Sequence, residues 1–122
     1  MATNFVQNGG IIEYANAGAA ISSGDVVVVG TQIGIALVDI AATSGVGSVA
    51  MEGIYNVPKV DAAVIAQGEE VFYDVSASEF DDNLATPATG DVSNCCVAWE
   101  AKGATTGETI AVKLNVGVGL VT

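Results

Sequence analysis

Residues 23–57 read SGDVVVVGTQIGIALVDIAATSGVGSVAMEGIYNV, and this stretch decides the fold class. Val26 to Val29 form a short β-branched run closed by Gly30, which is typical of a strand buried on both faces rather than of a helix. From Val49 to Val57, successive side chains are expected to point to opposite faces of a strand. Gly53 lies in the middle of that expected strand, where we expect a bulge, a sharp bend or a close backbone contact.

The rest of the chain continues this β pattern. No long segment has the 3.6-residue periodicity of an amphipathic helix, and short apolar runs alternate with turn residues. The sequence therefore predicts an all-β protein, a small β-barrel or sandwich. The length of 122 residues suits one domain. We expect residues 1–10 to form an N-terminal arm and residues 11–122 a single β domain, with residues 75–92 as a long projecting loop inserted in it.

The two halves of the chain resemble one another. Three pairs of short motifs occur in the same order: Ile21-x-x-Gly24-Asp25-x-Val27 and Ile65-x-x-Gly68-Glu69-x-Val71, Gly34-Ile35-Ala36 and Cys96-Val97-Ala98, and Val49-Ala50-Met51 and Ile110-Ala111-Val112. The second half differs by the extra segment 75–92. Either the chain contains a degenerate duplication that builds a pseudo-two-fold barrel or sandwich, or these short matches arise by chance.

Charge excludes several classes of function. The chain has 14 acidic residues, three lysines, no arginine and no histidine, for a net charge of −11. Nucleic-acid backbones are neutralised by Lys and Arg, so we expect no nucleic-acid partner. The missing histidine removes the commonest general base and metal ligand, and the missing arginine removes the bidentate clamp for anionic substrates. We therefore predict neither a cofactor nor a metal site.

Hydropathy indicates either a well-filled core or subunit contacts. The hydrophobic fraction is 51% and the mean hydropathy is +0.54, which is high for a soluble monomer. Small outward side chains on a filled β core would explain this, as would apolar surface buried against other subunits. The longest near-apolar run, residues 26–38, is too short to cross a bilayer, so no membrane partner is expected.

Cys95 and Cys96 are adjacent, and their Cα atoms, about 3.8 Å apart across a trans peptide, are closer than a disulfide normally allows. We therefore expect two reduced, packed thiols. We expect no metal site there, because further ligands at workable spacing are missing nearby. The segment Asp81-Asp82-Asn83 has the oxygen chemistry of a calcium site without the EF-hand spacing, and is interpreted as a solvated acidic loop.

Several stretches together resemble the DUF2190 family of tailed-phage proteins. They are Gly10-Ile11-Ile12-Glu13-Tyr14, Ile21-Ser22-Ser23-Gly24-Asp25-Val26-Val27, Val29-Gly30 with Ile33-Gly34-Ile35-Ala36, Glu52-Gly53-Ile54-Tyr55 with Val57-Pro58-Lys59, and Gln67-Gly68-Glu69 with Val71 and Tyr73-Asp74. Family members are described as capsid decoration, or cement, proteins. The resemblance implies a small β protein on the outer surface of the virion head that clamps the major capsid protein lattice after assembly in the host cytoplasm. Cys96 stands where the family pattern suggests glycine, which bears on local packing. Some members carry a recombinase-like label, but the chain has no G-x-x-x-x-G-K-[ST] phosphate loop.

Two other functions compete with the structural one. A carboxylate-based hydrolase could use Glu69-Glu70 or Asp81-Asp82, but neighbours in a strand point to opposite faces, so we predict that the protein is not an enzyme. A head-fibre or glycan- and receptor-binding module could use residues 75–92 as its reading loop. Glycan binding favours exposed aromatic residues, and that loop offers only Phe80.

The two ends of the chain are the predicted contact elements. The tail alternates glycine with apolar residues, and an exposed apolar edge promotes association unless it is covered. We expect a homo-oligomer, a trimer at three-fold positions or a dimer at two-fold positions. The residues predicted to contact the capsid or another subunit are Ala2, Thr3, Asn4, Phe5, Val6 and Gln7 in the arm, and Val116, Val118, Leu120 and Val121 in the tail. Trp99, the one tryptophan, is expected to be a core or interface anchor.

Overall fold

The computed structural model describes residues 3–4 and 6–122, which form ten strands and no helix. All sheet ladders are antiparallel, which confirms the all-β class. The strands are β1 (Ile11–Ala15), β2 (Val26–Val29), β3 (Gln32–Ala36), β4 (Val46–Ala50), β5 (Ile54–Pro58), β6 (Glu70–Asp74), β7 (Glu79–Asp82), β8 (Val92–Ala98), β9 (Thr109–Lys113) and β10 (Leu120–Val121).

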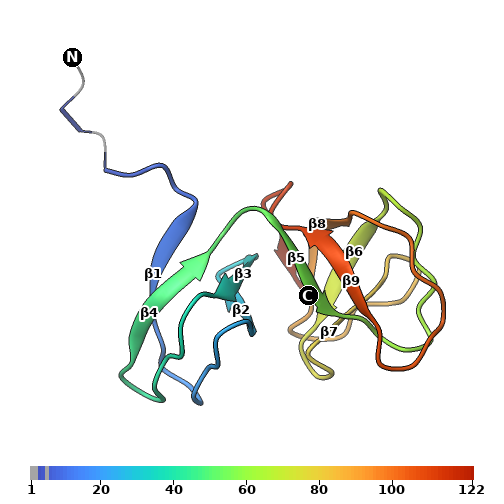
Figure 1. Ribbon diagram of the computed structural model, residues 1–122, viewed down its shortest axis with the longest axis horizontal. Helices are drawn as coiled ribbons and strands as arrows, with labels where there is room; N and C mark the ends of the chain where they lie inside the picture. The colour runs from blue at the N-terminus through green and yellow to red at the C-terminus, as the bar shows by residue number, and fades with distance from the viewer. Residues whose placement is uncertain (1–2, 5) are drawn as a thin grey trace.

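The strands form two sheets that occupy two lobes, side by side in Figure 1. Residues 11–50, here the N-terminal lobe, contain a four-stranded sheet in the order β1-β4-β3-β2. Residues 54–122, the C-terminal lobe, contain the order β5-β9-β8-β6-β7, with β10 paired to β8. Neither sheet closes into a complete barrel, so the fold is sandwich-like.

The same four-strand unit occurs in both lobes, because β1-β4-β3-β2 has the same arrangement as β5-β9-β8-β6. The corners before β2 and β6 also share their backbone hydrogen bonds. The Gly24 amide donates to the Ala36 carbonyl at 2.8 Å, and the Gly68 amide donates to the Ala98 carbonyl at 2.9 Å. Both glycines have positive φ, +93° and +87°, where a side chain would be strained. The internal similarity is thus a repeated structural unit.

One of the three predicted correspondences is shifted by two residues. Ala36 pairs with Val49 in the N-terminal lobe, and the equivalent Ala98 pairs with Val112 in the C-terminal lobe. Val112, and not Ile110, is therefore the counterpart of Val49. Side chains alternate with a period of two, so a shift by two residues keeps apolar residues on the inner face, and the sequence pattern alone does not distinguish the two registers.

The segment 75–92, predicted as one projecting loop, instead contains strand β7 and the first residue of β8. Strand β7 pairs along β6, and the Phe80 side chain is fully buried, with its ring centroid 5.2 Å from that of Tyr73. Burial of this aromatic ring holds the inserted segment against the lobe. Leu84, in the following turn, is 87% exposed.

The β2–β3 hairpin packs against the apolar clusters of both lobes. Val27 belongs to the apolar cluster of the N-terminal lobe, against which Val29 packs, whereas Val26 and Val28 pack against the cluster of the C-terminal lobe. This explains the uninterrupted valine run: both faces of β2 contact apolar side chains, although β2 is an edge strand and stays partly exposed.

Gly53 is where the chain passes from the first sheet to the second. It lies between β4 and β5 with φ of +113°, and its carbonyl accepts a hydrogen bond from the Leu114 amide at 3.0 Å. The predicted bend at this glycine is therefore present, but the single strand expected from Val49 to Val57 is wrong: β4 and β5 belong to different sheets, because the chain turns at Gly53.

Candidate interaction surfaces

The N-terminal arm runs away from both lobes (Figure 1). Of the predicted contact residues, Thr3, Asn4, Val6 and Gln7 are exposed, and Val6 reaches 87%. Ala2 and Phe5 lie outside the described residues. The Gln7 side chain donates a hydrogen bond to the Ile11 carbonyl, which ties the base of the arm to β1. The described part of the arm thus presents its side chains to solvent.

The C-terminal tail is bound to its own lobe. Its last residues form β10, which pairs with β8, and the Gly119 amide donates to the Asn94 carbonyl at 3.1 Å. Thr31 reaches across from the N-terminal lobe, where its hydroxyl donates to the Val118 carbonyl at 2.6 Å. The predicted residues Val116, Val118, Leu120 and Val121 are all exposed. The tail therefore offers apolar side chains, while much of its backbone is already bonded.

The structure does not bring the two predicted contact elements together. The arm leaves from β1 of the N-terminal lobe, whereas β10 lies on the C-terminal lobe (Figure 1). They are two separate surfaces at opposite ends of the chain.

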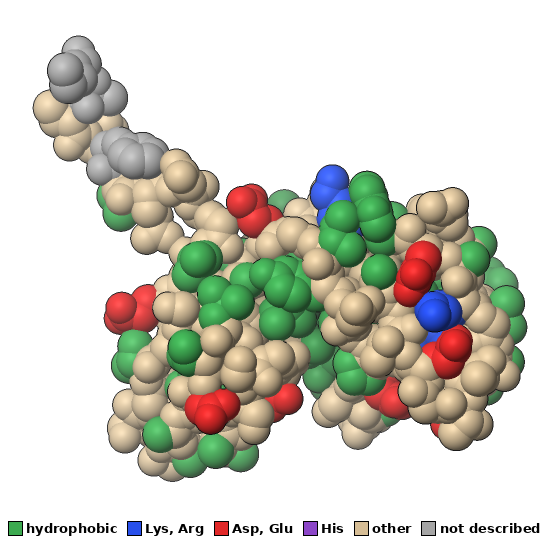
Figure 2. Space-filling view, in the orientation of Figure 1, with side chains coloured by type: hydrophobic (Ala, Val, Ile, Leu, Met, Phe, Trp, Pro, Cys, Tyr) green, Lys and Arg blue, Asp and Glu red, His purple; other side chains and the backbone are tan. Residues whose placement is uncertain are grey.

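An open groove of about 650 Å³ lies between the base of the arm and the junction of the lobes. It was not predicted from the sequence. Its lining combines apolar side chains with two carboxylates, and includes Ile11, Glu13, Leu37, Glu52 and Tyr55. Figure 2 shows hydrophobic side chains gathered on this face of the N-terminal lobe, toward the C-terminal lobe.

The groove follows from strand register. Ile11 pairs with Ala50, which pairs with Ile35, so these three side chains share the face of the sheet that turns toward the C-terminal lobe. Ile35 is covered by that lobe, but Ile11 remains about half exposed. Alternation from Gly10 to Tyr14 indicates which residues of this strand share a face. It does not indicate which face the other lobe covers, so the sequence does not predict the groove.

Trp99 lies on the surface of the C-terminal lobe and is 48% exposed. It is therefore not a core residue, which leaves the interface role as the remaining expectation. The Lys113 ammonium nitrogen lies 5.5 Å from the centroid of a Trp99 ring, within range of a cation–π contact. Ile54, which pairs with Lys113, is also exposed. These residues form a second apolar surface with a positive charge.

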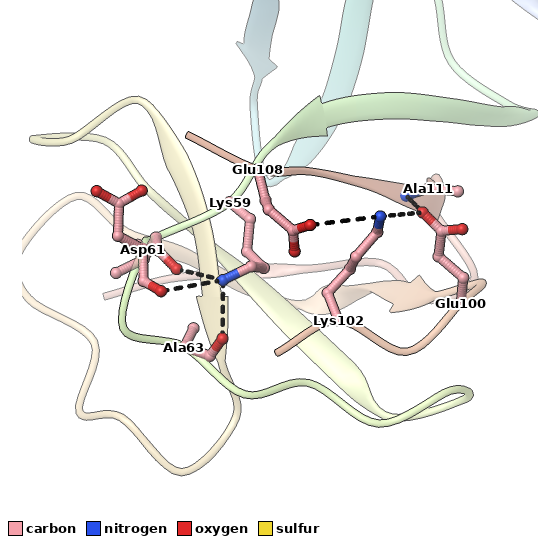
Figure 3. A network of polar contacts seen from close by, with 8 residues as sticks. Lys59, Asp61, Ala63, Glu100, Lys102, Glu108 and Ala111 are labelled. Carbon is pink, nitrogen blue, oxygen red and sulfur yellow. Dashed lines mark hydrogen bonds and ion pairs between the residues drawn. The ribbon is translucent and has the colours of Figure 1, made fainter. Parts of the chain in front are cut away.

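The other two lysines are bound within the C-terminal lobe (Figure 3). Lys59 is fully buried, and its ammonium donates to the carbonyls of Val60 at 2.7 Å and Ala63 at 2.8 Å. Lys102 lies 3.8 Å from carboxylate oxygens of both Glu100 and Glu108. With Lys113 on Trp99, each lysine has an intramolecular partner, so the surface is dominated by carboxylates.

Lys59 has a polar counterpart in the other repeat. The Asn16 amide donates to the Gly45 carbonyl just as the Lys59 amide donates to the Glu108 carbonyl. The Asn16 side chain then donates to the Ala19 carbonyl at 2.7 Å, which matches the bond from Lys59 to Ala63. Both buried polar groups hold the loop that leads into the next corner. Their role is structural, because each satisfies carbonyls that burial would otherwise leave unpaired.

The acidic residues of the described chain do not form a metal-binding cluster. Within residues 3–4 and 6–122, no group of three or more His, Cys, Asp or Glu side chains could hold a metal ion. Asp91 is buried, but it accepts hydrogen bonds from the Val75 and Ala88 amides at 3.1 and 2.8 Å, which closes the turn before β8. No helix in the described part of the chain is long and apolar enough to cross a membrane.

Cys95 and Cys96 are free and buried, as predicted. The thiol of Cys95 donates to the Asn115 side-chain oxygen at 2.8 Å. The adjacent Cys95 side chain and the burial of Cys96 raise the pKa of the Cys96 thiol, so this group stays protonated. Both cysteines belong to the core of the C-terminal lobe, which Ile33 and Ile35 of β3 also join.

A comparison with known families decides the class of protein. The family model described as phage cement protein matches residues 6–114, from the arm through β9. The chain belongs to this family. No curated protein and no solved structure shows a significant match to it. A phage cement protein is a structural protein of the bacteriophage capsid, so the chain has a capsid decoration role and a location on the virion capsid. The exposed arm and the groove of this cement protein are its candidate contact surfaces.

Proposed function

We propose that this cement protein binds the outer surface of a tailed-phage head and stabilises the major capsid protein lattice without catalysis. The family match carries the proposal, and the arrangement of contact surfaces supports it. Residues 7–11, at the base of the exposed arm, line the groove, so an extended segment of the capsid protein can contact the arm and the groove at once.

Charge supports the outer location. The chain carries a net charge of −11. Each lysine already has a partner: Lys59 donates to backbone carbonyls, Lys102 lies near two carboxylates, and Lys113 lies over an indole ring. Contact with packaged nucleic acid would bring carboxylates against phosphates and release few counterions. An acidic, mostly β surface is compatible with the outside of the shell instead.

Self-association is part of the proposal. The exposed side chains of the arm, of the tail and of Trp99 offer apolar area for contacts between copies. A trimer at three-fold positions is the leading arrangement, and a dimer at two-fold positions is the alternative. Repetition over a lattice multiplies weak contacts through high effective concentration, so each contact can be small.

The direct test uses expanded capsids that lack the cement protein. Purified protein should bind them and raise their melting temperature, because a ligand that binds only the assembled state stabilises that state. Leu37→Asp, which puts a charge in the groove beside Glu13 and Glu52, should weaken binding at least tenfold. Leu84→Asp, at an exposed position of the C-terminal lobe, is the matched control and should bind normally. Absence of binding by the unmodified protein would refute the proposal.

A further inference from the structure

Strand β7 has no counterpart in the N-terminal lobe. In the C-terminal lobe, residues 75–91 connect β6 to β8 and contribute β7, which pairs with β6. In the N-terminal lobe, Gly30 and Thr31 alone connect β2 to β3. The sheet of that lobe therefore ends at β2, and no strand of the described chain pairs with its second edge.

The pairing between β2 and β3 shows which backbone groups of β2 lie on its unpaired edge. Ile33 lies opposite Val28, but its amide and its carbonyl are both bonded to the Asn115 side chain. Because hydrogen-bonded and non-bonded pairs alternate in an antiparallel ladder, Val27 and Val29 make the bonds to β3. The amide and carbonyl of Val28 consequently point outward, where the equivalent Phe72 meets Asp81 of β7.

The missing strand leaves the core of the N-terminal lobe partly open. Three of its residues are half-buried where their equivalents in the C-terminal lobe are buried. The pairs are Val29 and Tyr73, Tyr14 and Val57, and Ile21 and Ile65. In the C-terminal lobe, the buried Phe80 completes the same region: it lies on Tyr73, and its carbonyl accepts a hydrogen bond from the Val60 amide at 2.9 Å.

We propose that the N-terminal arm of a second copy of this chain adds a strand to the free edge of β2, in the place that β7 takes in the C-terminal lobe. An unpaired strand edge is a template for such addition, and an inserted apolar side chain would cover Val29 and Tyr14. The proposal goes beyond capsid decoration, since it assigns the contact between copies and not the contact with the capsid.

Three properties of the arm make it the fitting occupant. Residues 1–10 contain no charged side chain, whereas all 14 acidic residues lie in 11–122, so the arm can approach an acidic neighbour without repulsion. Thr3, Asn4 and the residues 6–8 are exposed, and the arm points away from its own lobes. Its sequence Asn4-Phe5-Val6-Gln7 places two apolar residues between polar ones, so one of the two would face the open core if the arm were extended, as Phe80 faces the core in β7.

Length is also sufficient. Residues 3–8, if extended, span about 20 Å at roughly 3.3 Å per residue, which exceeds the length of a four-residue strand such as β7. The arm is therefore long enough to form a strand the length of β7, and Gly9 and Gly10 allow its direction to change.

The test is a directed cross-link between full-length chains. A Val6→Cys chain is mixed under mild oxidation with an Ala17→Cys chain, since Ala17 is exposed and equivalent to Val60, which contacts Phe80. The native cysteines are buried and contribute little. We expect the mixed disulfide to form at least tenfold faster than with a Leu84→Cys chain, whose side chain is exposed on the other lobe. Equal rates at the two positions would overturn the proposal.

A second measurement uses a full-length chain with one substitution in the arm, which lies outside the folded lobes, so the substitution does not disturb them. Val6→Asp should reduce the association of copies at least tenfold in sedimentation equilibrium, whereas Leu84→Asp, at an equally exposed position in the turn after β7, should leave it unchanged. Unchanged association of Val6→Asp would also overturn the proposal. Capsid binding is measured separately, with the unmodified protein. If that protein does not bind capsids but the cysteine variants still form the cross-link, the capsid proposal is refuted and arm insertion is supported.

Discussion

The side-chain amide of Asn115 pairs with the backbone of Ile33 as a neighbouring strand would. Its oxygen accepts a hydrogen bond from the Ile33 amide at 3.0 Å, and its nitrogen donates to the Ile33 carbonyl at 2.7 Å. The same nitrogen donates to the Met51 carbonyl at 2.6 Å. One side chain that follows β9 thereby fastens both β3 and the end of β4, so it joins the two lobes.

Replacement of Asn115 by alanine should destabilise the protein by about 2–4 kcal/mol, because it leaves buried amide and carbonyl groups without partners. Asn115 also has φ of +54°, which alanine tolerates poorly. Asn94 is the matched control: its φ is +58°, but its side chain is exposed and makes none of these bonds. In denaturant titration Asn94→Ala should lose only about 1 kcal/mol. Equal losses would show that the amide bonds add nothing.

Gly119 is a site where no side chain fits. A Cβ atom there would clash with the Thr31 carbonyl oxygen, and φ is +80°. Gly119→Ala should displace the tail from the N-terminal lobe and cost about 2–4 kcal/mol. Gly107→Ala shares the backbone strain, with φ of +75°, but meets open space, so it should cost only about 1 kcal/mol. Thermal unfolding of the two variants measures their losses of stability, and the difference between these losses is the cost of the clash. A difference below about 0.5 kcal/mol would contradict the predicted clash.

Lys59 should be far more important for stability than Lys102. Lys59→Met keeps the apolar stem but leaves the buried carbonyls of Val60 and Ala63 without their donor, which should cost about 2–4 kcal/mol. Lys102→Met removes only partly exposed ion pairs at 3.8 Å, and should change stability by less than about 1 kcal/mol. Urea titration at neutral pH measures both; a Lys59→Met protein as stable as the wild type would show that water replaces the ammonium.

The turn between β6 and β7 should weaken in acid. The Asp74 carboxylate accepts hydrogen bonds from the Ser76 hydroxyl at 2.7 Å and from the Ser76 and Ala77 amides, and these bonds lower the pKa of Asp74. Because the folded-state pKa lies below the unfolded value, this stabilisation is present above about pH 4 and is lost as the pH falls through the folded-state pKa. Asp74→Asn should therefore flatten the acid limb of the stability curve.

The matched control for this turn is Glu79→Gln, which removes a half-buried carboxylate from the other strand of the same hairpin. It should leave the acid limb closer to that of the wild type, because the turn bonds to Asp74 remain intact. Urea titrations between about pH 2 and pH 7 measure both variants. An acid limb that is unchanged in Asp74→Asn would contradict this assignment.

The β2–β3 hairpin shows which features follow from the sequence pattern and which depend on tertiary contacts. The valine run indicates a strand with two covered faces, but the covering partner of one face is a lobe whose strands come from residues 54–122. Likewise, Phe80 stands out as an apolar residue in a polar segment, yet its burial follows from pairing of β7 with β6. The groove was missed because it depends on which half of a sheet the other lobe leaves uncovered.

The sequence by itself determined the all-β class, the bend at Gly53, the reduced cysteines and the two matching corners, because each depends on local backbone chemistry or on alternation along one strand. Only the tertiary structure decided that the two repeats lie in separate lobes, that the inserted segment completes one and leaves the other open, and that Asn115 joins them. These features depend on contacts between residues far apart in the chain, and a periodic pattern carries no record of which distant partner covers a face.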